Sequence, residues 1–195
     1  MQSETFIFFG IVGSGKGTQV KLLIDALKNK TGKETLYASP GNEYRNLITL
    51  ETQTASLVKT TLDKGALLPD FLTNAVVLNI LIPVISSDKH LIADGFPRSL
   101  AQAKCFEEAM DFYGRKNTKI VYLELSKEEA VKRMKLRARH DDTDEGIAKR
   151  FDEYEKNVIP AMNYFKDKEG YSVFTINGEQ TIEQVQNDIN KALGL

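Results

Sequence analysis

The segment that most restricts the fold of this chain is the glycine-rich stretch GIVGSGKGT at residues 10–18. An apolar run, 6–9, comes directly before it and is typical of a buried strand, and residues 16–30 carry apolar side chains on one helical face. Glycines let the backbone curl so that several N–H groups point at one phosphate. The start of a helix adds the positive end of its dipole. The stretch therefore predicts a phosphate-binding loop.

Two side chains of this loop carry chemistry. Lys16 supplies a mobile positive charge for the β- and γ-phosphates of a nucleotide, and the hydroxyl of Thr18 can reach Mg²⁺. The general motif has Ser or Thr directly after the lysine, whereas here Gly17 intervenes. The alternative is a glycine-rich turn that binds nothing. Such a loop indicates a nucleoside triphosphate without naming the reaction. The predicted ATP-binding residues in the loop are Gly13, Ser14, Gly15, Lys16, Gly17 and Thr18.

Short apolar runs alternate with longer amphipathic ones along the rest of the chain. This alternation predicts an α/β fold in which helices cover both faces of a parallel five-stranded sheet. In such sheets ligands bind beyond the carboxyl ends of the strands. The further strands are expected at 35–38, 90–94, 119–125 and 171–176. The helices are expected at 16–30, 42–64 in two pieces, 71–86 with a disturbance at Pro83, 99–113, from Ser126, at 145–168 with an interruption at Pro160, and from Thr181.

Composition narrows the class of protein. The 195 residues fit one domain, and the net charge of −1 gives no general attraction to nucleic acid or to a membrane. Cys105 is the single cysteine, which suits a reducing cytoplasm. The amino-terminal residues lack the basic and apolar regions of a signal peptide, and the apolar runs are too short to span a bilayer. We therefore expect a cytoplasmic protein that binds neither nucleic acid nor membrane.

A second motif, DGFPR at residues 94–98, follows the expected strand 90–94. Asp94 at a strand end can hold the water shell of Mg²⁺, and Arg98 can clamp a phosphate with two hydrogen bonds. Gln102 lies one helical turn further on, where its amide can bind the edge of a base through a donor and an acceptor. The alternative is a turn-capping aspartate followed by an exposed arginine and glutamine.

Together, the stretches 13–19 (GSGKGTQ) and 94–103 (DGFPRSLAQA) resemble the adenylate kinase family. The resemblance implies the P-loop NTPase fold, a three-layer α/β/α arrangement with a five-stranded parallel core, and a reaction in which Mg²⁺ and ATP serve to phosphorylate AMP. It divides the single domain into a core at 1–38, 70–133 and 143–195, a small helical NMP-binding lobe at about 39–69, and a short lid at about 134–142.

The resemblance also assigns residues to the acceptor nucleotide. The stretch SPGNEYR at 39–45 is similar to a family segment, with Arg45 at the position that binds the NMP phosphate. Pro40 and Asn42 depart from the family pattern, which leaves UMP, CMP or another NMP open as the acceptor, while Gln102 favours AMP. The predicted NMP-binding residues are Ser39, Gly41, Arg45, Gly65, Leu68, Gly95, Arg98 and Gln102.

The basic stretch 131–150 resembles the family lid. By position Arg133 stacks on the ATP adenine, whereas Arg137, Arg139 and Arg150 bind the transferring phosphates. Arg137 and Arg139 stand so close in sequence that their roles are interchangeable. Asp141 and Asp142 are hinge residues, arginine partners or helix caps. A charged, solvated helix face is the alternative for the whole stretch.

We therefore predict a monomeric nucleoside monophosphate kinase with AMP as the favoured acceptor. Its catalytic residues are expected to be Lys16, Arg98, Arg137, Arg139 and Arg150, and Thr18 and Asp94 to hold Mg²⁺ through water. Three alternatives remain: a kinase for UMP, CMP or another NMP, a weakly active nucleotide-binding regulator, and a simple ATPase.

Overall fold

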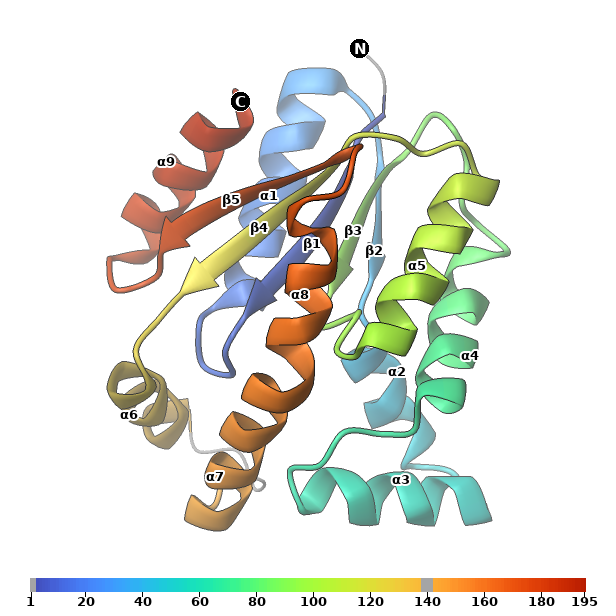
Figure 1. Ribbon diagram of the computed structural model, residues 1–195, viewed down its shortest axis with the longest axis vertical. Helices are drawn as coiled ribbons and strands as arrows, with labels where there is room; N and C mark the ends of the chain where they lie inside the picture. The colour runs from blue at the N-terminus through green and yellow to red at the C-terminus, as the bar shows by residue number, and fades with distance from the viewer. Residues whose placement is uncertain (1–2, 138–141) are drawn as a thin grey trace.

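A single parallel sheet forms the centre of the molecule (Figure 1). The computed structural model describes residues 3–137 and 142–195. Within those ranges five strands lie in the order β2-β3-β1-β4-β5, and every pair of neighbours is parallel. The expected α/β architecture is confirmed. The strands are β1 (Thr5–Gly10), β2 (Thr35–Ala38), β3 (His90–Asp94), β4 (Thr118–Glu124) and β5 (Tyr171–Asn177).

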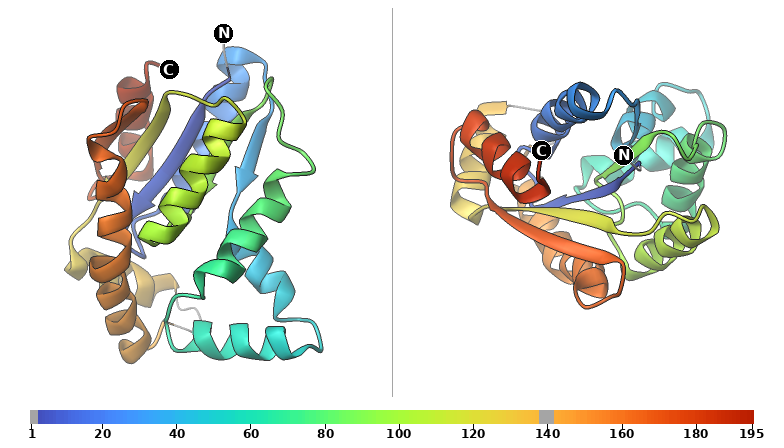
Figure 2. Two further views of the ribbon diagram at one scale, coloured as in Figure 1. Left: turned by 45° about the vertical axis from the view of Figure 1, so that its right-hand side comes forward. Right: turned by 90° about the horizontal axis from the view of Figure 1, so that it is seen from above.

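Helices cover both faces of the sheet. α1 (Lys16–Thr31) and α9 (Ile182–Leu193) lie on one face, whereas α4 (Asp70–Leu81), α5 (Leu100–Phe112) and α8 (Ile159–Lys166) lie on the other, as the view from above shows (Figure 2). β1 is buried along its whole length because it is the central strand between these two layers. A strand that is buried on both faces is apolar throughout, which explains the run of aromatic and aliphatic residues before the glycine loop.

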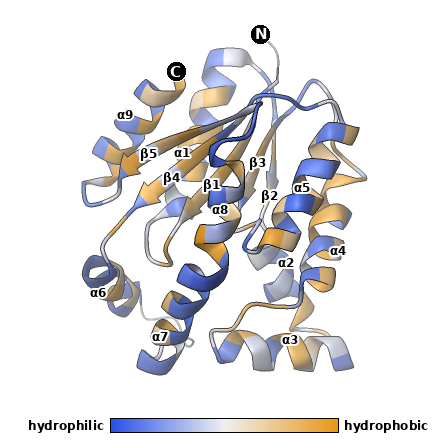
Figure 3. Cartoon of the chain, in the orientation of Figure 1, coloured by the Kyte–Doolittle hydropathy of each residue, from blue (hydrophilic) through white to orange (hydrophobic). Residues whose placement is uncertain are grey.

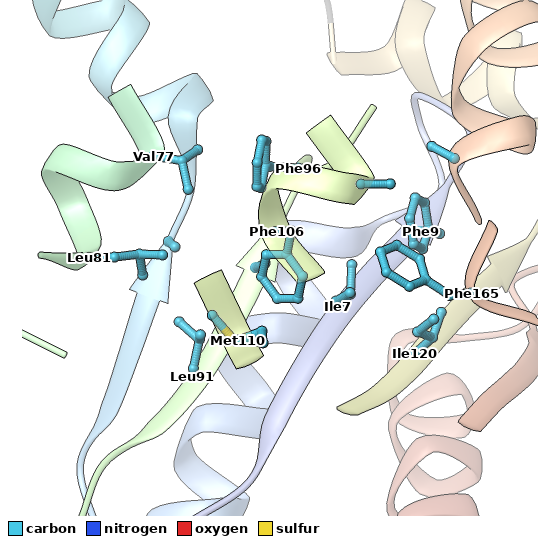
Figure 4. Packing of buried hydrophobic residues seen from close by; sticks show 14 residues of the cluster. Ile7, Phe9, Val77, Leu81, Leu91, Phe96, Phe106, Met110, Ile120 and Phe165 are labelled. Atoms are coloured by element: carbon cyan, nitrogen blue, oxygen red, sulfur yellow. The ribbon is translucent and has the colours of Figure 1, made fainter. Parts of the chain in front are cut away.

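Alternate side chains of β1 enter two different cores, as the two-residue period of a strand requires. Ile7 and Phe9 belong to the core under α4, α5 and α8, and Phe6 and Phe8 belong to the core under α1 and α9. In the first core the ring of Phe106 meets two other aromatic rings edge to face, at centroid distances of 6.1 Å to Phe96 and 6.5 Å to Phe165 (Figure 4). These layers hold the sheet rigid, so that its carboxyl edge can position side chains.

Four helices extend beyond the carboxyl ends of the strands. α2 (Pro40–Leu47) and α3 (Gln53–Asp63) share a small core of Tyr44, Val58 and Leu68. On the opposite side α6 (Lys127–Arg137) and α7 (Asp144–Glu153) pack around Ala130, Met134 and Ile147. Figure 3 colours α6 mainly hydrophilic, in contrast to the sheet. These peripheral groups flank the edge at which ligands of such sheets bind.

Two prolines set helix boundaries. α4 was expected to continue to Ser86 but ends at Leu81, two residues before Pro83. The expected interruption around Pro160 is a π-helical turn, Tyr154–Val158, which separates α7 from α8. A proline lacks the N–H that would continue the α-helical hydrogen bonds. The regular α-helical pattern is therefore interrupted near each of these two prolines.

Helices were expected to start at Ser126 and at Thr181, where the spacing to Glu129 and to Gln184 matches a capping box, and only the second box is complete. Thr181 and Gln184 form both reciprocal bonds at the start of α9. Ser126 accepts from the backbone N–H of Glu129, but its own N–H donates to Glu179, since the Glu129 carboxylate is engaged with arginine and lysine of α6.

None of the helices in the described part of the chain is long and apolar enough to cross a membrane.

Candidate functional site

The glycine loop connects β1 directly to α1. Gly13 has a φ of +88°, and a Cβ atom there would stand 2.9 Å from the carbonyl oxygen of Ala130 in α6. A side chain at this position would therefore collide with α6 as well as strain the backbone. Gly15 also has a positive φ, and Ser14 is buried. The loop thus has the curled backbone that the sequence predicts, and it abuts the helix that carries Arg133 and Arg137.

Lys16 folds back over the loop that precedes it. Its Nζ donates hydrogen bonds to the carbonyl oxygens of Gly10 at 2.7 Å and Ile11 at 3.1 Å, and to Oγ of Ser14 at 3.3 Å. The pKa of Lys16 is lowered to about 8, mainly because protein atoms replace water around the ammonium group. The charge of Asp94 raises this pKa, and Arg98 and Arg137 lower it, so that charges from β3, the loop after it and α6 all act on one lysine.

Asp94 ends β3 beside the phosphate loop. It is paired in register with Phe8 of β1, and its Oδ2 lies 3.9 Å from where a Cβ atom on Gly17 would stand. The hydroxyl of Tyr37 donates to the same oxygen at 2.8 Å. Burial and then the charge of Asp94 raise the pKa of Tyr37 to about 12, so the phenol stays protonated and remains a donor.

The oxygens near Asp94 fit a hard cation. Thr18 lies in the first turn of α1 with an exposed side chain, directly after Gly17, whose Cβ position is the one that lies 3.9 Å from the carboxylate. Mg²⁺ prefers one or two carboxylates together with water and phosphate oxygens. Asp94 and Thr18 therefore suit it. The contact of Tyr37 was not predicted: the sequence pattern placed this residue in a strand, but the pairing of that strand with β3 is known only from the structure.

Arg98 and Gln102 follow β3 as expected, but their surroundings differ. Arg98 folds over the backbone of Gly95, whose added Cβ would stand 2.8 Å from Nη2 of the arginine. The side chain of Gln102 is buried: its Oε1 accepts from the backbone N–H of Arg98 at 2.8 Å, and its Nε2 donates to Oδ1 of Asp70 at 2.8 Å. Asp70 was not among the predicted site residues, because it lies 32 positions from Gln102.

The predicted acceptor segment forms the start of α2. Ser39 is the N-cap residue, and Pro40 occupies the first turn, where a missing N–H costs nothing. Arg45 folds back along this turn: it donates to Oδ1 of Asn42 and lies beside Gly41. The departures from the family pattern thus have local explanations, since Pro40 begins the helix and Asn42 holds the arginine.

The other two predicted acceptor residues lie between α3 and α4. Leu68 is buried in the small core with Tyr44 and Val58. Gly65 has a φ of +69°, and a Cβ atom on it would stand 2.6 Å from the carbonyl oxygen of Gly146 in α7. The lobe of α2 and α3 therefore touches the helix that follows the predicted lid.

The lid arginines converge on one carboxylate. Arg137 donates to Asp142 through Nη2 at 2.8 Å and Nε at 3.1 Å, and Nη1 of Arg150 donates to the same residue at 2.8 Å. Asp142 is therefore an arginine partner, as considered, and it does not cap α7, because the N-cap of that helix is Thr143. The remaining lid prediction, Arg139, falls at a position outside the described residues, as does Asp141.

Arg133 points towards the loop after β5. Its Nε donates to Glu129 at 2.9 Å and its Nη2 to the carbonyl oxygen of Gly178 at 2.9 Å, so the guanidinium plane is held between two elements. Beside it lies a hollow of about 470 Å³, in the size range of small-molecule sites. The residues around the hollow are Glu129, Arg133, Glu179, Gln180, Thr181 and Gln184.

A parallel sheet whose first strand leads through a curled glycine loop into a helix defines the class of P-loop nucleotide-binding proteins. The family model for adenylate kinase matches residues 8–170. Adenylate kinase 1 of Nostoc sp. is 31% identical over 188 residues, which cover 96% of this chain and 97% of that protein. The adenylate kinase of Parabacteroides distasonis is 33% identical over 194 residues, with 96% of each chain covered. This chain belongs to the adenylate kinase family.

Proposed function

We propose that this chain transfers the γ-phosphoryl group of ATP to AMP and so forms two molecules of ADP. The observation that carries the proposal is the convergence of positive charge at the phosphate loop. Lys16 of α1 is close enough to Arg98, after β3, and to Arg137 of α6 for both guanidinium charges to lower its pKa. Phosphoryl transfer requires this concentration of positive charge, because the moving group carries charge on its oxygens.

The proposed roles follow the positions of the groups. The backbone N–H groups of the phosphate loop and Lys16 hold the donor phosphates, with Arg133 stacked on the adenine of ATP beside the 470 Å³ hollow. Arg45 and Arg98 hold the acceptor phosphate. Arg137 and Arg150, joined by Asp142, stabilise the charge in transit, as does Arg139. Catalysis is positioning and electrostatic stabilisation, so no covalent intermediate is required.

Magnesium is proposed to accompany ATP. Asp94 and Thr18 would hold it through water, and Tyr37 would keep the carboxylate in place with its 2.8 Å hydrogen bond. Bound there, the ion would neutralise part of the charge on the β- and γ-phosphates.

Two mobile parts are proposed around a rigid core. The NMP-binding lobe at about 39–69 contains α2 and α3, and the lid at about 134–142 joins the end of α6 to α7. Closure of these parts would exclude water and so suppress hydrolysis of ATP. We further propose a cytoplasmic monomer, on the grounds of the single cysteine and of the family resemblance.

The test is ADP formation from ATP with AMP, CMP, UMP or GMP as the acceptor, with the Lys16→Ala variant as the blank. We expect two ADP for each AMP consumed and the highest kcat/KM with AMP. Better turnover with UMP or CMP would identify a different NMP kinase. Binding of ATP and AMP without ADP formation would identify a regulator, and ADP formation without any acceptor would identify an ATPase.

A further inference from the structure

Asp70 begins α4, and its carboxylate contacts α5 at two points. Its Oδ1 accepts from Oγ of Ser99 at 2.7 Å and from Nε2 of Gln102 at 2.8 Å. Ser99 in turn caps α5 by accepting from the backbone N–H of Gln102. The first turns of two helices are therefore joined through one carboxylate oxygen, and the glutamine side chain at this junction is almost wholly buried, with 2% exposed.

The two partners of Gln102 determine which way its amide faces. A carboxylate can only accept a hydrogen bond, so the side of the amide that faces Asp70 must be the NH₂ group. A backbone N–H can only donate, so the side that faces Arg98 must be the carbonyl oxygen. Rotation of the amide by 180° would set acceptor against acceptor and donor against donor. The orientation is thus fixed from both ends by chemistry.

One hydrogen-bond donor and one acceptor of Gln102 remain. An NH₂ group has two hydrogens and an amide oxygen has two lone pairs, and within residues 3–137 and 142–195 the protein uses one of each. The remaining pair complements a base that offers a ring nitrogen as acceptor and an amino group as donor. Adenine has this pattern at N1 and its 6-amino group. Hypoxanthine has the same size but the reverse pattern, since its N1 carries a hydrogen and its 6-position is a carbonyl oxygen.

We propose that Asp70 is a positioning residue that sets the acceptor-base preference by fixing the amide of Gln102 in the orientation that matches amino-bearing bases and rejects their oxo counterparts. This inference rests on the proposed function, in which Gln102 contacts the acceptor base. The carboxylate acts through Gln102 and does not itself touch the nucleotide. By the same pattern cytosine, with an acceptor N3 and a 4-amino group, is tolerated in hydrogen bonding, whereas uracil and guanine are not.

A purely structural role for the same contacts has a different consequence. Asp70 lies in the first turn of α4, where a negative charge stabilises the helix dipole, and Gln102 stands three residues after an N-cap serine. If capping were the whole role, loss of the carboxylate would lower stability and would affect all acceptors equally. The preference for AMP over IMP is therefore the quantity that separates the two roles.

The experiment measures binding and kcat/KM of AMP and of IMP for the wild-type chain and for Asp70→Asn. Asparagine has the same shape but can present either a donor or an acceptor to Gln102. The control is Glu183→Gln, which removes a first-turn carboxylate from α9, on the other side of the sheet (Figure 1). A site built to hydrogen-bond one pattern rejects its reverse strongly, so we expect the wild type to favour AMP by about 10³-fold or more.

Asp70→Asn is expected to reduce the AMP-to-IMP ratio by about tenfold, because Arg98 still holds the carbonyl end of the amide. The control should leave the ratio unchanged. Ser99→Ala, which keeps the carboxylate but removes one of its donors, should cause a smaller reduction and provides a second test if Asp70→Asn does not fold. An unchanged ratio in these variants, or equal binding of AMP and IMP by the wild type, overturns the inference. If the binding preference responds as expected but no ADP forms, the inference stands and the proposed phosphoryl transfer fails.

Discussion

The donor loop and the acceptor side hold their polar groups in different ways. The ammonium group of Lys16 donates hydrogen bonds to Gly10, Ile11 and Ser14, which all lie within the six residues that precede it. On the acceptor side, Gln102 depends on Asp70, 32 positions away, and Gly65 touches Gly146 of α7. The side chain of Lys16 is thus held by its own segment, whereas the amide of Gln102 and the turn at Gly65 are held by contacts with other elements. Changes at the two places should therefore have different kinds of effect.

The largest expected effect is on the donor side. Lys16→Ala removes the charge that is proposed to meet the donor phosphates, and we expect kcat/KM for ATP to fall by about 10³-fold. Since the contacts of Lys16 are local, the affinity for AMP and the cooperativity of unfolding should stay near those of the wild type. Steady-state kinetics measures kcat/KM for ATP and the affinity for AMP, and thermal unfolding measures the cooperativity. A variant that unfolds, or that loses AMP binding to the same degree, would show that the loop is not organised independently.

The acceptor side should respond through stability. Gly65→Ala places a methyl group 2.6 Å from the carbonyl oxygen of Gly146, in a backbone conformation with φ of +69°. Gly32→Ala is the matched control, because Gly32 has φ of +70° and open space around it. Both variants carry the backbone strain, and only the first carries the collision. Denaturant unfolding should show Gly65→Ala less stable than Gly32→Ala by about 1–3 kcal/mol. Equal losses would mean that the contact with α7 contributes nothing.

A pH dependence of nucleotide binding should belong to the donor side alone. The pKa of Lys16 is about 8 in the ligand-free protein, so the lysine loses its proton as the pH rises past this value. If ATP binds the charged form, as proposed, its affinity should fall by about tenfold per pH unit above pH 8. Lys16→Arg stays charged and should show a flat profile between pH 8 and 10. Calorimetric titration with ATP measures both slopes; a flat wild-type profile would contradict the assignment.

The smallest effect is expected at the opposite edge of the sheet, away from both nucleotide sites. His90 is buried at the start of β3, where Nδ1 accepts from the N–H of Glu4 at 3.1 Å and Nε2 lies 3.0 Å from Oγ1 of Thr31. Burial is the main cause that lowers the pKa of His90 below 6.5. The negative charge of Glu4 raises this pKa, whereas the positive charges of the nearby lysines and Arg115 lower it further.

A lowered histidine pKa means that the unfolded chain takes up a proton before the folded one. The stability from neutral His90 is therefore complete above about pH 6.5 and is lost as the pH falls below it, by at most about 1.4 kcal/mol per pH unit. His90→Asn should remove this contribution to the slope, with the relative affinities for ATP and AMP unchanged. Unfolding free energies from pH 7.5 to 5 measure it; identical slopes for both proteins would contradict the account.

The contrast between local and distant contacts also explains what the sequence could predict. The strands, the parallel order and the phosphate loop were predicted because each depends on a short pattern, such as the apolar run before Gly10 or the glycine spacing around Lys16. Asp70 and Tyr37 were missed, because their partners Gln102 and Asp94 lie 32 and 57 positions away. The disturbance predicted at Pro83 is found, but the helix ends at Leu81 and does not reach Ser86, since the effect of Pro83 extends to the preceding turn.

Departures from a family pattern were also hard to interpret from sequence alone. Pro40 raised doubt about the acceptor base, yet it begins α2 at a position where proline is favoured. Asn42 raised the same doubt, and its amide oxygen holds Arg45. Both substitutions thus have structural explanations that involve residues within a single helical turn.

The central claim is that two separate groups of positive charge, one for each nucleotide, meet at the carboxyl edge of the sheet. The most direct test is calorimetric binding of ATP and of AMP, each alone, to Lys16→Ala and to Arg45→Ala. We predict a crossed result: Lys16→Ala weakens ATP and leaves AMP, whereas Arg45→Ala weakens AMP and leaves ATP. If either variant weakened both nucleotides equally, the two sites would not be separate and the account would be contradicted.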